Sequence, residues 1–170
     1  MGAAAVHVAV SGGGDADPDT RRLAEELGRA LARRGAVVVT GGLGGVMEAA
    51  CRGAKDAGGT TIGILPSDDR ADANPWVDVA VPTGLGEGRN ALVVRAADAV
   101  VALAGGFGTL SEIALALRLG RPVVGLGTWE LGRGGRPEGV ITIASDPEDA
   151  AGKAVDLAGA TRGRARRSGS

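Results

Sequence analysis

The chain has 170 residues, which is the length of one ordinary domain. Hydrophobic residues make up 44% of it and charged residues 23%, a balance typical of globular proteins. The net charge of −1 argues against a general nucleic-acid binder. No apolar run approaches the length that spans a bilayer, and the first residues lack a basic segment followed by a long apolar core, so we expect neither a membrane span nor secretion. We therefore expect no nucleic-acid partner and no membrane partner.

The sulfur and imidazole side chains are few. Cys51 is the only cysteine, so no disulfide forms within the chain, which fits a reducing cytoplasm. It lies among alanines at helical spacing, which favours a buried structural thiol over a nucleophile. His7 is the only histidine and stands within an apolar run, where we expect a strand. The sequence therefore predicts no metal site.

Strand-like and helix-like segments alternate along the chain. Short apolar runs predict seven strands, at residues 3–10, 36–40, 60–65, 77–81, 99–104, 122–126 and 140–144. Apolar residues at helical spacing predict helices at residues 18–34, 46–54, 90–97, 110–119 and from 147 onward. Asp17-Pro18 and Asp146-Pro147 each pair a capping residue with a proline in the first helical turn. The polar stretch 67–75 is the best loop candidate.

This alternation predicts the fold class. Strands that are apolar throughout are buried on both faces, and crossover helices between them make the strands parallel. We therefore expect an α/β, Rossmann-like three-layer fold, with a mostly parallel sheet of about seven strands and helices on both faces. A single nucleotide-binding domain is expected over residues 1–160. A disordered basic tail is expected over residues 161–170, because this segment is rich in glycine, serine and arginine.

A glycine-rich turn at residues 105–109 is the strongest candidate binding feature. It lies between an apolar strand and a helix, where free backbone N–H groups and the helix dipole attract a phosphate. Glycine clusters also follow the first and second strands, and ligands bind beyond the carboxyl ends of parallel strands. A plain tight connection between strand and helix is the alternative interpretation.

Two common nucleotide motifs are absent. The dinucleotide fingerprint needs glycines at its first, third and sixth positions, but Gly12 and Gly14 are followed by Asp17, and Gly42 and Gly44 by Met47. The phosphate-binding loop of nucleotidases, which ends in Gly-Lys-Ser/Thr, does not occur. NAD, FAD and P-loop chemistry are therefore disfavoured.

Two charged residues accompany the turn. Arg89 stands where a helix begins, a position unfavourable for a cation unless a phosphate or carboxylate compensates it. An ordinary surface arginine at a frayed helix end is the alternative. Glu112 follows Thr109 by three residues, the spacing of a capping box. Such a box needs no catalytic role for the carboxylate, although both roles can coexist.

Three segments together resemble the Lonely Guy (LOG) superfamily, often mislabelled lysine decarboxylase. They are residues 41–47 (Gly-Gly-Leu-Gly-Gly-Val-Met), 88–90 (Gly-Arg-Asn) and 104–112 (Ala-Gly-Gly-Phe-Gly-Thr-Leu-Ser-Glu). LOG enzymes are phosphoribohydrolases that cleave a nucleoside 5′-monophosphate into base and ribose 5-phosphate. The resemblance implies catalytic roles for Arg89 and Glu112. The residues that we expect to bind phosphate or nucleotide are Gly105, Gly106, Phe107, Gly108, Thr109, Ser11, Gly12, Gly41, Gly42, Gly45, Met47 and Asn90.

The chain also departs from the LOG pattern. Ala104 replaces a proline, Ser111 replaces the first of two glutamates, and Glu87-Gly88 and Asn90 replace the Met-His and Lys around the arginine. These changes are more similar to the molybdenum-cofactor carrier-like branch, whose members bind a phosphorylated pterin or nucleotide.

The resemblance leaves several functions open. We weigh a carrier that binds a nucleoside monophosphate or molybdopterin-type cofactor, a phosphoribohydrolase, and a regulatory subunit with an inert pocket. No cofactor is expected to be required for the fold. The resemblance also implies a homodimer or homotetramer. Two apolar helical stripes could form the subunit interface or could equally pack on the sheet: Val93, Val94 and Ala97, and Leu115, Leu117 and Leu119.

Overall fold

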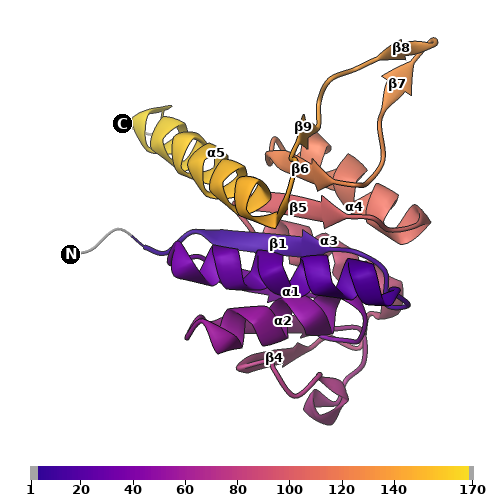
Figure 1. Cartoon of the computed structure of the whole chain (residues 1–170), viewed down its shortest axis with the longest axis vertical. Helices are drawn as coiled ribbons and strands as arrows, with labels where there is room; N and C mark the ends of the chain where they lie inside the picture. Colours follow the sequence, from indigo (N-terminus) through magenta and orange to yellow (C-terminus); the bar gives the residue numbers. More distant parts are fainter. Residues whose placement is uncertain (1–3, 169–170) are drawn as a thin grey trace.

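The computed structural model describes residues 4–168. Seven strands form one sheet in the order β4-β3-β2-β1-β5-β6-β9, and every neighbouring pair is parallel (Figure 1). The strands are β1 (His7–Ser11), β2 (Val37–Thr40), β3 (Thr61–Leu65), β4 (Val79–Pro82), β5 (Ala99–Leu103), β6 (Val123–Leu126) and β9 (Thr142–Ile143). The main helices are α1 (Pro18–Arg33), α2 (Val46–Asp56), α3 (Asn90–Arg95), α4 (Phe107–Arg118) and α5 (Pro147–Ser168).

Helices cover both faces of the sheet. On one face α1, α2 and α5 pack through a cluster that includes Leu27, Val46 and Ala154. On the other face α3 and α4 pack through Val94 and Ile113. Nearly all of this core is Ala, Val, Leu and Ile, so the layers are joined by small aliphatic groups. The predicted Rossmann-like three-layer fold is confirmed.

The predicted helix starts at Asp17 and Asp146 are also confirmed. The Asp17 carboxylate accepts a hydrogen bond from the backbone N–H of Thr20 at 2.7 Å. Asp146 accepts one from the N–H of Asp149 at 2.8 Å. Both aspartates therefore satisfy N–H groups that the first helical turn leaves free.

Helix α3 and the second half of α4 face inward. Val93, Val94 and Ala97 are each about 1% exposed and belong to the core, so they pack on the sheet rather than on a partner subunit. Leu115, Leu117 and Leu119 are partly buried against the same cluster. No helix within residues 4–168 is long and apolar enough to cross a bilayer.

The structure differs from the prediction at the carboxyl end of the chain. Helix α5 continues to Ser168, well beyond the expected start of a disordered tail at residue 161. Arg162 donates hydrogen bonds to the carbonyls of Ala4 and Ala5 and lies 3.3 Å from the carboxylate of Asp98. Composition alone did not show these contacts with residues far away in the sequence. Residues 169–170 lie outside the described part.

A small hairpin was also missed. Strands β7 (Gly132–Arg133) and β8 (Arg136–Pro137) pair antiparallel and project from the body (Figure 1). Gly134 and Gly135 both have positive φ, at 57° and 78°, as a tight two-residue hairpin turn requires. No apolar alternation marks these short exposed strands, so periodicity did not predict them.

Candidate functional site

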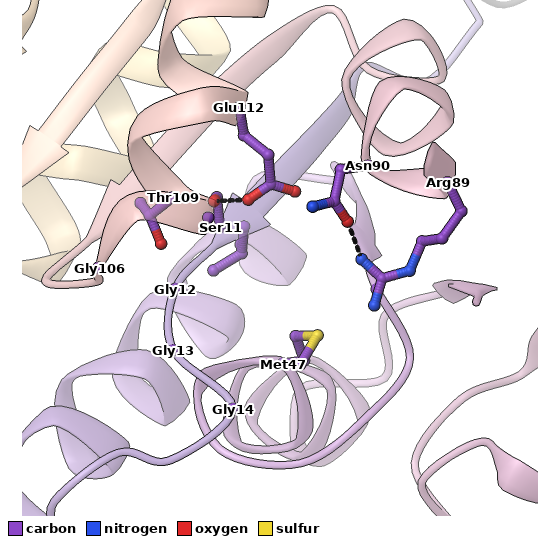
Figure 2. Close-up of a pocket in the computed structure, with 13 residues that line it drawn as sticks. Ser11, Gly12, Gly13, Gly14, Met47, Arg89, Asn90, Gly106, Thr109 and Glu112 are labelled. Atoms are coloured by element: carbon purple, nitrogen blue, oxygen red, sulfur yellow. Dashed lines mark hydrogen bonds between the residues drawn. The ribbon is translucent and has the colours of Figure 1, made fainter. Parts of the chain in front are cut away.

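A cavity of about 190 Å³ lies beyond the carboxyl ends of β1 and β5 (Figure 2). From β1 the chain builds the sheet outward toward β4, and from β5 it builds outward toward β9. The gap between β1 and β5 is therefore the topological switch point, where α/β sheets bind ligands. The lining residues are Val10, Ser11, Gly12, Gly13, Gly14, Gly41, Met47, Arg89, Asn90, Gly106, Gly108, Thr109 and Glu112.

The first turn of α4 borders this cavity. Gly106 is the N-cap, and the first backbone bond of the helix runs from the N–H of Leu110 to its carbonyl. The N–H groups of residues 107–109 thus have no acceptor within the helix. They stand at the positive end of the helix dipole, which is the arrangement that binds anions. The helix begins three residues before the predicted start at residue 110, so Gly108 and Thr109 are helical.

Arg89 is buried beside the cavity. It ends a short 3-10 helix (Gly86–Arg89), and only 9% of the residue is exposed. One guanidinium nitrogen donates to the side-chain oxygen of Asn90, while the Nε atom is buried without a partner. Burial lowers the pKa of Arg89, and Glu112 opposes this change. A buried guanidinium with an unpaired N–H is unusual, and an anionic ligand in the cavity that Arg89 lines would compensate its charge. The alternative prediction, that Arg89 is an ordinary surface arginine at a frayed helix end, is therefore wrong.

Glu112 lies across the cavity from Arg89. Its carboxylate accepts a hydrogen bond from the hydroxyl of Ser11, at the end of β1 (Figure 2). The predicted capping box is wrong, because Gly106 is the N-cap and no side chain caps the helix. Thr109 occupies the third helical position, so it cannot act as the cap. Glu112 is instead a buried carboxylate that Ser11 orients toward the cavity.

The burial of Glu112 has a consequence for stability. Burial raises the pKa of its carboxyl group, although the Ser11 hydroxyl and Arg89 both oppose this. An acid with a raised pKa contributes stability at low pH that is lost as the pH rises through that pKa. Glu112→Gln should therefore become more stable relative to the native chain as the pH rises above the ordinary pKa of a glutamate, about 4.3.

Urea unfolding at several pH values would measure this difference in the free energy of unfolding. Exposed Glu130 supplies the control variant Glu130→Gln. A Glu112→Gln difference that stays constant with pH, after subtraction of the control, would contradict the raised pKa.

The predicted nucleotide-binding glycines that line the cavity separate into two groups. Gly106 and Gly108 line the cavity, and a Cβ atom at either position would project into open space. Gly12 and Gly41 also line it, but a Cβ atom there would meet Val46 at 2.6 Å or the Arg89 guanidinium at 2.6 Å. Glycine is needed at these two positions because Val46 and Arg89 pack directly against the backbone there.

Three other predicted glycines lie behind the cavity lining. They are Gly42, Gly45 and Gly105, which have φ values of 76°, 66° and 93° and are not among the lining residues. Their positive φ favours glycine and shapes the turns that carry the site.

A second and larger cavity adjoins the first. It measures about 590 Å³ and shares Asn90, Gly108 and Glu112 with its neighbour. The remaining lining residues are Glu87, Gly88, Ala91, Phe107, Ser111 and Leu115. Four of the positions at which the chain departs from the phosphoribohydrolase pattern, residues 87, 88, 90 and 111, therefore line this one cavity. Of the positions that retain the pattern, residues 89, 106, 108, 109 and 112 line the first cavity, and residues 108 and 112 line the second as well.

Sequence reasoning missed the residues that support the turn before α4. The Thr128 hydroxyl donates to the carbonyl of Ala104 at 2.6 Å. The indole N–H of Trp129 donates to the carbonyl of Gly106 at 3.2 Å, and its ring lies 5.6 Å from that of Phe107. These residues follow β6, far from the turn in sequence, so no local pattern connected them. They fix both ends of the turn.

Ala104 has a positive φ of 47°, an unusual conformation for a residue with a side chain. Its N–H donates to the carbonyl of Leu126 at 3.2 Å. Proline fixes φ near −65° and has no N–H, so Ala104→Pro should lose about 3 kcal/mol of stability or more.

Ala104→Gly is the matched variant, because glycine adopts positive φ freely and keeps the N–H. Thermal unfolding of both variants measures the effect. Equal stability of the proline and glycine variants would show that the turn does not need this conformation.

Comparison with known proteins places the chain in a family. The model of the SLOG cluster4 family matches residues 5–151, and the chain belongs to that family. A protein of Archaeoglobus fulgidus is 41% identical over 121 residues, which cover 71% of this chain and 80% of the relative. The structure is similar to the molybdenum cofactor binding protein of Rippkaea orientalis, with a TM-score of 0.78 and 39% identity over 85% of this chain and 92% of the other. The Moco carrier protein of Chlamydomonas reinhardtii gives a TM-score of 0.80 and 36% identity, over 92% and 99% of the two chains.

The similarity to the LOG enzymes is shorter. The cytokinin riboside 5′-monophosphate phosphoribohydrolase LOG of rice is 33% identical over 125 residues, which cover 71% of this chain. The chain thus spans about half of that enzyme, 47% of its length. The predicted resemblance to the LOG superfamily, and within it to the molybdenum-cofactor carrier-like branch, is confirmed.

Proposed function

We propose that this protein binds a phosphorylated pterin of the molybdenum-cofactor type in the two joined cavities and carries it without cleaving it. The observation that carries the proposal is the buried Arg89 guanidinium, which lines the same cavity as the start of α4 and has an Nε N–H without a partner among residues 4–168. Together they supply a positive charge and several N–H donors for one phosphate. The adjoining cavity of about 590 Å³ provides room for the rest of the ligand.

The comparisons support the carrier more than the enzyme. The similarity to the two cofactor-binding structures covers 92% and 99% of those chains, whereas it covers 47% of the rice enzyme. Ser111 occupies the position of the first glutamate in the LOG motif, and its hydroxyl donates to the carbonyl of Gly108 at 2.8 Å. Among residues 4–168, Glu112 is the one carboxylate that lines the first cavity.

Co-purification tests the carrier. The protein would be expressed in a host that makes the molybdenum cofactor, and bound pterin would be measured by fluorescence after acid oxidation. We expect pterin in the purified protein and its loss in Arg89→Met. Protein without pterin, from a host whose own molybdoenzymes are loaded, would contradict the proposal.

A phosphoribohydrolase is the second candidate. It is favoured by Glu112 and Arg89, which line one cavity, because a carboxylate can stabilise positive charge at the ribose while an arginine holds the phosphate. Incubation with AMP and other nucleoside monophosphates, followed by measurement of free base, tests it. Release that disappears in Glu112→Gln would establish the enzyme. The carrier proposal predicts no release.

The assembly of the chain into a homodimer or homotetramer stays a prediction. Light scattering of the purified protein would determine its mass in solution.

A further inference from the structure

The second cavity has a lining that is chemically unlike that of the first. It contains no cationic side chain, whereas it contains the carboxylates of Glu87 and Glu112. Apolar surface comes from Phe107, Leu115 and Ala91. A phosphate would be repelled from such a lining, and a flat neutral ring that carries N–H donors would be attracted to it.

Two side chains in this cavity are largely exposed. Phe107 is 81% exposed, although it is the only phenylalanine of the chain, and its ring lies 5.6 Å from that of Trp129. The Glu87 side chain is exposed and forms no hydrogen bond or ion pair within residues 4–168, whereas its backbone carbonyl accepts from the N–H of Asn90. Gly88, which follows it, has no side chain to fill the space between the 3-10 helix and α4.

We propose that Glu87 selects the ring of the ligand, an inference that rests on the proposed function. A carboxylate has two acceptor oxygens and matches a ring edge with two adjacent N–H donors. The 2-amino-4-oxopyrimidine edge, common to pterins and guanine, presents such a ring N–H and amino group. Adenine presents one donor and one acceptor at the corresponding edge, so it satisfies only one oxygen. The Phe107 ring offers an apolar surface on which the heterocycle packs.

The two cavities are joined in a way that suits a ligand with its phosphate in the first cavity and its ring in the second. Asn90, Gly108 and Glu112 line both cavities, so a molecule with its phosphate at α4 extends past them toward Glu87. Glu87 and Arg89 are two residues apart on the same short 3-10 helix. One segment of the chain therefore carries a cation toward the phosphate cavity and a carboxylate toward the ring cavity.

GMP and IMP are the probes, because they differ only in the 2-amino group. Titration calorimetry on the purified full chain should show that GMP binds about tenfold more tightly than IMP. Glu87→Gln should reduce this ratio to near one, mainly by weakening GMP, because the amide keeps only one acceptor oxygen. The matched control Glu130→Gln, an exposed glutamate outside both cavities, should keep the native ratio. Circular dichroism would confirm that each variant is folded.

The outcomes distinguish this inference from the proposed function. Equal affinity of the native protein for GMP and IMP, or an unchanged ratio in Glu87→Gln, would overturn the role of Glu87 while leaving the phosphate site intact. Failure of the native protein to bind either nucleotide would overturn the inference, and failure to co-purify with pterin as well would overturn the proposed function. A Phe107→Ala variant that dissociates an oligomer without changing GMP affinity would assign the second cavity to a partner copy, and would also overturn the inference.

Discussion

Gly106→Val should weaken the binding of GMP, or of a phosphorylated pterin, by about a hundredfold or more. The Cβ atom of residue 106 would project into open space beside the cavity, so the branched side chain occupies the room that a phosphate needs at the start of α4. The backbone at Gly106 has φ −95° and ψ −151°, an extended conformation at the edge of the β region that does not need the positive φ typical of glycine. The fold should therefore tolerate the change, at a cost of about 1 kcal/mol from the poorer N-cap.

Gly159→Val is the matched control. Gly159 lies on α5, where a Cβ atom also meets nothing within 4 Å, and it is far from both cavities. Calorimetric titration would compare the two variants with the native chain. A Gly106→Val variant that is folded and binds with native affinity would show that the phosphate does not bind at the start of α4.

Arg89→Met should weaken the binding of a phosphorylated ligand about 10-fold to 150-fold, which corresponds to the loss of one or two charge-assisted hydrogen bonds. Methionine retains much of the side-chain volume but removes the guanidinium, including the Nε N–H that has no partner among residues 4–168. Arg89→Lys should recover only part of the affinity, because an ammonium group cannot reproduce the planar donor set.

Arg95→Met provides the comparison for this prediction. Arg95 is exposed in the last turn of α3, six residues from Arg89 and outside both cavities. The Arg95→Met variant should bind the phosphorylated ligand as tightly as the native chain does. Equal affinities for the Arg89 and Arg95 variants would show that Arg89 is a structural cation rather than a phosphate ligand.

The layers of the fold were predictable because local patterns encode them. The apolar runs at β1, β2 and β5 are buried on both faces, and the alternation with helices leaves little choice but a parallel sheet. The positions of Asp17 and Asp146 at helix starts follow from the chemistry of capping. What the local pattern did not contain was the exact start of α4, because the glycines there have no apolar periodicity.

The site was predicted in its residues but not in its contacts. Arg89 and Glu112 were expected from the motifs, yet the partner of Glu112 is Ser11, 101 residues earlier in the chain. The spacing in the sequence favoured Thr109 as the partner of Glu112. In the fold, Ser11 at the end of β1 bonds Glu112 instead. Thr128 and Trp129 have no motif at all, since their role depends on β6 ending beside the turn. Their position in space could not be inferred from one sequence.

The central claim is that the joined cavities hold a phosphorylated pterin intact. The most direct test mixes the purified protein with molybdenum cofactor released from a molybdoenzyme, removes unbound material by gel filtration, and measures pterin and phosphate per chain. We predict close to one pterin per chain with its phosphate still attached, and almost none in Gly106→Val. Native protein that retains no more pterin than Gly106→Val, or that releases the phosphate from the pterin, would contradict the account.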